Sequence, residues 1–130
     1  MNKEFYIAGV KFRPSAEIKL ALNEIEEGTE LFLDPEPTNR FDPNAIRIVY
    51  GNPVEERPLF IGYVPKIYSS EITGLIEIGL DVKCYATKIN KTGKTWEMFK
   101  VVVREVDEEP IEGPDAGDGP DYDEGNREEN

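Results

Sequence analysis

The sequence contains no histidine and only one cysteine, Cys84, among its 130 residues. Without histidine the chain lacks the usual general base near neutral pH and the commonest protein ligand for metals. One cysteine cannot form a disulfide within the chain or a zinc site built from several thiolates, and it fits a reducing compartment. Cys84 falls in a predicted strand, so we expect it to be a small buried hydrophobic side chain rather than a reactive thiol.

Long apolar runs are missing too. No stretch approaches the ~20 apolar residues that span a membrane. The short apolar segment 6–10 is followed by a lysine and is not the apolar core of a signal peptide. We therefore expect a cytoplasmic protein.

The glycine-rich phosphate loops and the G-x-S-x-G motif are absent as well. The composition favours a binding module over an enzyme and predicts neither a cofactor nor a metal.

The net charge of −12 is distributed unevenly. Of the 27 acidic and 15 basic residues, 11 acidic and one basic lie in residues 107–130, so this segment carries −10 and residues 1–106 carry −2. The segment is rich in glycine and proline and has almost no apolar side chains. It cannot bury enough surface to offset the entropy lost on ordering, so we predict a disordered acidic tail after one folded domain at residues 1–106.

The folded part shows the patterns of short strands and two helices. The expected order is strand, helix, three strands, helix and two strands, at residues 4–12, 15–28, 29–34, 45–50, 59–64, 68–78, 81–90 and 95–106. Acidic residues near the end of the first helix oppose its dipole, so that helix should be short or frayed there. This order predicts a mainly β (α+β) fold, a small six-stranded OB-like or SH3-like barrel whose edges are closed by curvature or covered by the helices.

The loop at residues 36–44 is rich in proline and polar side chains around a single aromatic. Asp42-Pro43-Asn44 suits a type I turn, because proline presets φ and the aspartate side chain can bond the backbone two residues on. Two interpretations remain open from the residues alone: a capped turn with Phe41 in the core, or a binding site at the rim of a sheet. The nearby carboxylates of Asp34, Glu36 and Asp42 are commoner as caps than as a hydrolytic or two-metal site.

Two stretches together resemble the HIRAN domain. The loop reads Asn39-Arg40-Phe41-Asp42-Pro43-Asn44-Ala45-Ile46, and 15 residues later comes Ile61-Gly62-Tyr63-Val64-Pro65-Lys66. In that family an N-x-[YF]-D-x-N-A-[IV] loop is followed by a strand and a G-[YH]-[VL]-x-[KR] segment. The segment 6–10 is similar to the family's first strand, and Glu36-Pro37 to its approach to the loop. The resemblance covers roughly residues 4–105 and suggests a stand-alone bacterial or phage-type HIRAN protein.

This resemblance implies a barrel similar to an OB fold that binds the 3′-hydroxyl end of single-stranded DNA by aromatic stacking and a carboxylate contact. The family also occurs on helicase-like remodelling enzymes, which implies a role in DNA repair, replication or remodelling and a helicase or nuclease partner. Carried over by position, the resemblance assigns base stacking to Tyr6 and Phe41, the 3′-hydroxyl contact to Asp42, base or backbone contacts to Asn39, and sugar and phosphate contacts to Tyr63 and Lys66, with Arg40 in the same site. Phe41 stands where tyrosine is usual, so a phenolic hydrogen bond is lost.

Three further features leave alternatives open. Trp96 is predicted in the core, with a stacking role as the alternative. Lys83, Lys88, Lys91, Lys94 and Lys100 either form a basic stripe on the last hairpin or simply solvate an exposed face. The acidic tail is compatible with a self-limited DNA-binding protein, with a protein-interaction module that does not bind DNA, with a DNA-mimicking inhibitor, and with a solubilising appendage.

Overall fold

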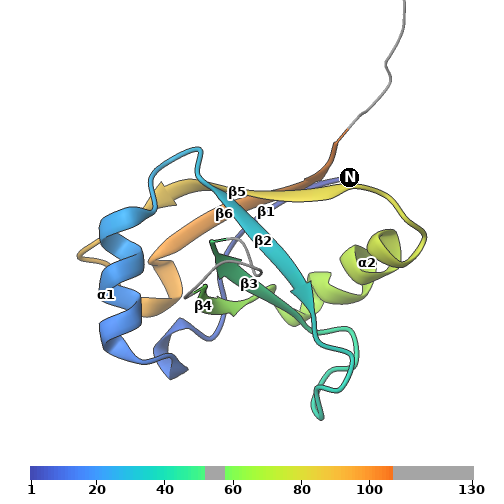
Figure 1. Ribbon diagram of the computed structural model, residues 1–130, viewed down its shortest axis with the longest axis horizontal. Helices are drawn as coiled ribbons and strands as arrows, with labels where there is room; N and C mark the ends of the chain where they lie inside the picture. Colours follow the sequence, from blue (N-terminus) through green and yellow to red (C-terminus); the bar gives the residue numbers. More distant parts are fainter. Residues whose placement is uncertain (52–57, 107–130) are drawn as a thin grey trace, which may run out of the picture.

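The computed structural model describes residues 1–51 and 58–106, so the predicted tail lies outside the described residues. The strands and helices follow the predicted order (Figure 1). They are β1 (Asn2–Tyr6), η1 (Val10–Phe12), α1 (Ser15–Glu24), β2 (Glu30–Pro35), β3 (Ile46–Tyr50), β4 (Leu59–Tyr63), α2 (Lys66–Glu77), β5 (Val82–Ile89), η2 (Thr95–Glu97) and β6 (Phe99–Glu105), where η marks a short 3-10 helix. The predicted mainly β class with two α-helices is confirmed.

The six strands form one antiparallel sheet in the order β1-β6-β5-β2-β3-β4. The sheet curls until its two edges meet. Just after β1, the N–H of Ala8 donates to the carbonyl of Tyr63 on β4 (2.9 Å), and the N–H of Tyr63 donates back to Ala8 (2.8 Å). This bridge satisfies backbone groups that a sheet edge would leave open, and it gives the predicted barrel-like form.

The interior of the curled sheet is apolar. Side chains of the strands that point inward are almost inaccessible to solvent, among them Leu31, Ile48, Ile61, Phe99 and Val101, and so is Ile7 directly after β1. α1 adds Ala21 and α2 adds Ile72 to this core. Cys84 is fully buried, as predicted, and burial raises the pKa of its thiol to about 12. None of the helices in the described part of the chain is long and apolar enough to cross a membrane.

The first strand is shorter than predicted. The pattern predicted one strand over residues 4–12, but β1 ends at Tyr6. Gly9 has a φ of 76°, a left-handed conformation that glycine adopts without steric cost, and Val10–Phe12 then turns as η1. Phe12 consequently leaves the sheet, and its side chain is 77% exposed.

The hairpin between β5 and β6 overturns the prediction for Trp96. Residues Thr95–Glu97 form η2, where the N–H of Glu97 donates to the carbonyl of Lys94 (2.8 Å), so β6 begins only at Phe99. Trp96 is 60% exposed, and the core position is taken by Phe99 instead. The reason is local: the 3-10 turn uses the residues that a longer strand would have needed.

The helix ends follow local signals. α1 stops at Glu24, well before Gly28, in keeping with the expected short C-terminal end. α2 begins at Lys66, two residues earlier than predicted, directly after Pro65. At its other end the N–H groups of Gly79 and Leu80 donate to carbonyls of the last turn (3.0 and 3.1 Å), which is the Schellman pattern. Because β4 ends at Tyr63 and α2 begins at Lys66, the start of α2 lies immediately beyond the end of β4.

Candidate nucleic-acid interface

The side chain of Asn39 organises the loop between β2 and β3. Its Oδ1 accepts hydrogen bonds from the N–H groups of Phe41 and Asp42 (both 2.9 Å), and its Nδ2 donates to Glu36 Oε1 (2.8 Å). These bonds fix the backbone beneath Phe41, whose side chain is 87% exposed. Of the two interpretations of this loop, the one that places Phe41 in the core is therefore wrong. In this structure the Asn39 side chain therefore holds the backbone of the loop in place.

Asp42 ties the same loop to α2. Its Oδ1 accepts the N–H of Asn44 (2.9 Å), and the N–H of Ala45 donates to the Asp42 carbonyl (2.9 Å), which closes the expected β-turn. Its Oδ2 accepts the hydroxyl of Ser69 (2.8 Å), a buried side chain on α2. One turn further on, buried Thr73 donates to the carbonyl of Asn44 (2.8 Å). An ionised carboxylate offers about four acceptor positions, so Asp42 can accept further hydrogen bonds from a ligand.

Glu36 joins the loop to β4. Its Oε1 accepts the hydroxyl of Tyr63 (2.8 Å) as well as the Asn39 amide. The bonds from Asn39 and Tyr63 lower the pKa of Glu36. Desolvation and the bond to Glu36 raise the pKa of Tyr63. The hydroxyl of Tyr63 thus already donates a hydrogen bond to another side chain of the protein.

The three carboxylates around the loop serve different partners. Asp34 accepts a hydrogen bond from Arg47 Nε (3.1 Å), and this pairing raises the pKa of Arg47. Glu36 and Asp42 hold the loop from opposite ends, through β4 and α2. Within residues 1–51 and 58–106, no group of three or more cysteine, aspartate or glutamate side chains is placed to hold a metal ion.

A hollow of about 330 Å³ lies between this loop, η1 and the start of α2. We call it the loop groove. Five of the seven predicted site residues line it, namely Asn39, Phe41, Asp42, Tyr63 and Lys66. Its lining also includes Phe12, an exposed aromatic residue that the prediction did not name. The groove thus brings together two exposed aromatic rings, a carboxylate and an ammonium group from three separate segments of the chain.

Two predicted site residues do not line the groove. Arg40 is exposed on the loop. Tyr6 lies at the end of β1 opposite Lys100, whose Nζ is 5.6 Å from the centre of the Tyr6 ring. The second exposed aromatic ring of the groove belongs to Phe12, which the sequence reasoning missed because it treated residues 4–12 as one strand. Gly9 was the signal that the chain leaves the strand before Phe12.

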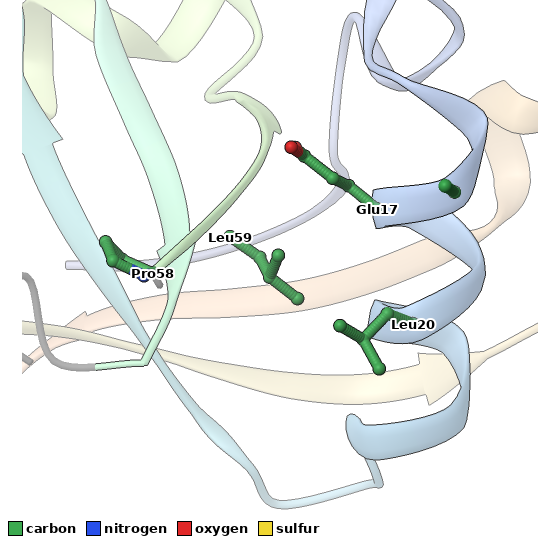
Figure 2. Close-up of a pocket in the computed structure, with 5 residues that line it drawn as sticks. Glu17, Leu20, Pro58 and Leu59 are labelled. Carbon is green, nitrogen blue, oxygen red and sulfur yellow. The ribbon is translucent and has the colours of Figure 1, made fainter. Parts of the chain in front are cut away.

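A second hollow, of about 290 Å³, lies between α1 and the start of β4 (Figure 2). Leu20 of α1 and Leu59 of β4 face each other across it. Glu17 is the charged residue of its lining and lies 3.9 Å from Arg13. The lining contains neither an aromatic ring nor a cation, so this hollow lacks the groups that bind nucleic acid in the manner expected of the loop groove.

Comparisons with known proteins agree with this fold. The family model of the HIRAN domain matches residues 2–104. A crystal structure of a protein from Lactobacillus plantarum is similar, with a TM-score of 0.63 and 14% identity over 81% of this chain and 97% of that one. The HIRAN domain of human HLTF has a TM-score of 0.57 and 10% identity over 80% of this chain and 74% of that one. No curated protein sequence matches. Because the family model spans most of its length, the chain belongs to the HIRAN domain family, whose members are in general DNA-binding domains.

Proposed function

We propose that the chain binds single-stranded DNA and holds the 3′-hydroxyl end of the strand in the loop groove. The observation that carries this proposal is the exposure of Phe12 (77%) and Phe41 (87%) in one groove beside the Asp42 carboxylate. Stacking of a base on an aromatic ring is worth about 1–3 kcal/mol and tolerates any base. Two rings in one groove can therefore hold terminal nucleotides without reading their sequence.

The Asp42 carboxylate supplies the preference for an end. A terminal 3′-hydroxyl has a proton to donate, and a carboxylate accepts it in a strong charge-assisted hydrogen bond. An internal nucleotide has a phosphate at that position, which a carboxylate repels. Because Asn44 and Ser69 hold both carboxylate oxygens in place, the acceptor is fixed before DNA arrives.

The start of α2 supplies positive charge for the neighbouring phosphate. Lys66 is the first residue of this helix and lines the groove. The N-terminus of a helix also carries a partial positive charge and free N–H groups that suit phosphate oxygens. Lys11 lies beside Phe12, with its Nζ 5.1 Å from the ring centre, and adds a second cation near the stacking surface.

The wider role follows from the same assignment. We infer a binding module without catalysis of its own, which acts on DNA ends in repair, replication or remodelling beside a helicase or nuclease partner. Membership of the HIRAN family supports the DNA binding in this proposal. The absence of histidine from the sequence is consistent with a module that binds rather than reacts.

The proposal is tested by titrating oligonucleotides that carry a 3′-hydroxyl, a 3′-phosphate or a blunt duplex end. We expect the 3′-hydroxyl strand to bind most tightly and Asp42→Ala to remove its advantage over the 3′-phosphate. Ser69→Ala is the matched control, because it loosens the loop but keeps the carboxylate and hence the preference. If none of the three DNAs binds, the end-binding function is wrong and the alternative of a protein-interaction module gains support.

A further inference from the structure

We propose that the outer side of β1, β6 and β5 binds the phosphodiester backbone of single-stranded DNA along its length. This surface, called the strand face below, is formed by Tyr6, Lys83, Tyr85, Lys88, Lys100 and Arg104. It is separate from the loop groove. The inference rests on the proposed function in one respect only: it takes the strand bound on this face to be the same strand whose end lies in the loop groove. It is tested with DNA that has no end.

The strand register arranges the basic groups of the strand face in two rows. Tyr6 lies opposite Lys100, and Lys100 lies opposite Lys88. Four residues further along β6, Arg104 lies opposite Lys83. The residues on either side of Tyr6 and of Lys100 are buried in the core, so Tyr6 and Lys100 point outward. At ~3.3 Å per residue the two rows are about 13 Å apart.

A β-bulge places Lys88 on this surface. Ala86 lies opposite Val101, and Lys88 lies opposite Lys100, so β5 contains one extra residue, Thr87. In a regular strand Lys88 would point to the same side as Ala86, which is buried. The bulge shifts the alternation and turns Lys88 outward. Bulges of this kind commonly re-aim a side chain beside a functional site.

The result is a pair of like charges directly across two strands, which destabilises a sheet. Lys83 Nζ lies 3.5 Å from Glu30 Oε2 and 3.9 Å from Asp81 Oδ1. These carboxylates offset the positive charge in the row of Lys83. In the described part of the chain, no carboxylate lies within 4.0 Å of the ammonium group of Lys88 or Lys100. A bound polyanion would remove this repulsion, because each phosphate can lie between two cations.

The aromatic residues of the strand face favour nucleic acid over other polyanions. Lys100 Nζ lies 5.6 Å from the ring centre of Tyr6, and the Arg104 guanidinium lies 5.0 Å from that of Tyr85. Tyr6 lies in the row of Lys100, and Tyr85 lies in the middle row beside Arg104, so each cationic row has a ring for a base close to a cation for a phosphate, the combination that single-strand-binding surfaces use. The register places Glu4 and Glu30 in the middle row with Tyr85, so the carboxylates of this face lie between the two cationic rows.

The strand face continues the loop groove. Tyr6 precedes by two residues Ala8, which lines the groove. In Figure 1 neither helix lies over the outer side of β1, β6 and β5. A strand whose end lies in the groove can therefore pass over Tyr6 and Lys100 and follow the face towards Arg104.

The test measures binding of the full chain to circular single-stranded DNA, which has no 3′ end, at a series of salt concentrations. The double variant Lys88→Gln/Lys100→Gln should bind more weakly, and the slope of log K against log salt should become smaller by about 1.4, at ~0.7 per phosphate contact. The factor by which the double variant loses affinity should then be about sevenfold larger at 50 mM salt than at 200 mM. Lys19→Glu on α1 is the control, because it changes the net charge equally on another surface.

Two outcomes would overturn the inference: no binding of the circle by the wild-type chain, or an unchanged affinity and slope in the double variant. An unchanged slope would mean that Lys88 and Lys100 make no contact with phosphate. The double variant should unfold at or above the wild-type temperature, because a like-charge contact is removed, so lost binding is not a folding defect. End recognition is judged separately, from 3′-hydroxyl against 3′-phosphate.

Discussion

At the scale of single residues, Phe12 and Phe41 are exposed although the core of the barrel is otherwise apolar and closed. Each sits where the local backbone is held by other residues: the left-handed turn at Gly9 directs Phe12 away from the sheet, and Asn39 holds the backbone of Phe41. Neither ring is needed to fill the interior. Their removal should therefore affect binding without affecting folding.

We expect Phe12→Ala and Phe41→Ala each to weaken binding of a 3′-hydroxyl oligonucleotide by about 1–3 kcal/mol, the value of one stacked base. The free energy of unfolding should change by less than ~0.5 kcal/mol, as is usual for exposed positions. Titration and urea unfolding measure the two quantities. Ile67→Ala is the control, since this exposed apolar residue of α2 does not line the loop groove. Equal affinities for all four proteins would contradict stacking.

Cys84 gives a second prediction for a single residue. Its thiol is fully buried and its pKa is raised to about 12, because burial disfavours the thiolate. At pH 8 the folded protein should react with a thiol reagent far more slowly than the unfolded protein in denaturant. A colorimetric thiol assay in the two states measures this ratio, and similar rates would mean that Cys84 is accessible in the folded state.

At the scale of elements, β4 can approach Ala8 because position 62 has no side chain. A Cβ at Gly62 would overlap the Ala8 carbonyl oxygen and come within 2.7 Å of Ile7 Cγ2. The bridge that closes the sheet and also frames the loop groove depends on this approach. We expect Gly62→Ala to lower the free energy of unfolding by about 1–3 kcal/mol, the usual cost of overpacking.

Gly74 on α2 provides the matched control for Gly62. A Cβ at Gly74 meets no atom within 4 Å, so Gly74→Ala should stabilise the helix by about 0.5–1 kcal/mol. Urea unfolding of both variants compares the two effects. If both substitutions changed the stability in the same direction, the close contact at Ala8 would not be what limits position 62.

The loop between β2 and β3 should respond to acid through Glu36. Hydrogen bonds from Asn39 and Tyr63 lower the pKa of Glu36 below its ordinary value of 4.5. A carboxyl group whose pKa is lower in the folded state stabilises that state above its unfolded pKa, and this contribution is lost as the pH falls through the folded pKa. The stability difference between wild type and Glu36→Gln should therefore be constant near pH 7 and shrink below pH 4.5. Urea unfolding at several pH values checks this, and a difference that does not vary with pH would contradict it.

At the scale of the whole molecule, most of the negative charge lies in one segment of the chain, outside the folded domain that the structure describes. Residues 1–106 carry a net charge of −2, while residues 107–130 carry −10 and lie outside the described residues. The loop groove and the strand face both belong to the nearly neutral part. The acidic segment should therefore oppose DNA binding through long-range repulsion alone.

We expect removal of residues 107–130 to strengthen single-stranded DNA binding, with the largest gain at low salt. The reason is screening: charges act over ~30 Å at 0.01 M salt but only about 8 Å at 0.15 M. Binding titrations of both proteins across this range measure the effect. A gain of the same size at all salt concentrations would show that the segment acts through a specific contact rather than through its charge.

Much of this molecule follows from the sequence alone. The order of strands and helices, the burial of Cys84, the turn at Asp42-Pro43-Asn44 and the family motif are all confirmed. These features depend on residues close together in the chain, through backbone propensity, apolar alternation and side-chain bonds to nearby backbone. They can therefore be seen without knowing which segments meet.

The tertiary structure alone decided which side chains share a surface. It joined Phe12 to Phe41 in one groove, placed Tyr6 outside that groove opposite Lys100, and exposed Trp96. Each outcome depends on where a strand stops and on register: β1 ends before Gly9, η2 replaces the start of β6, and one extra residue in β5 turns Lys88 outward. A shift of one residue moves a side chain to the opposite face, and such shifts are set by contacts between distant segments.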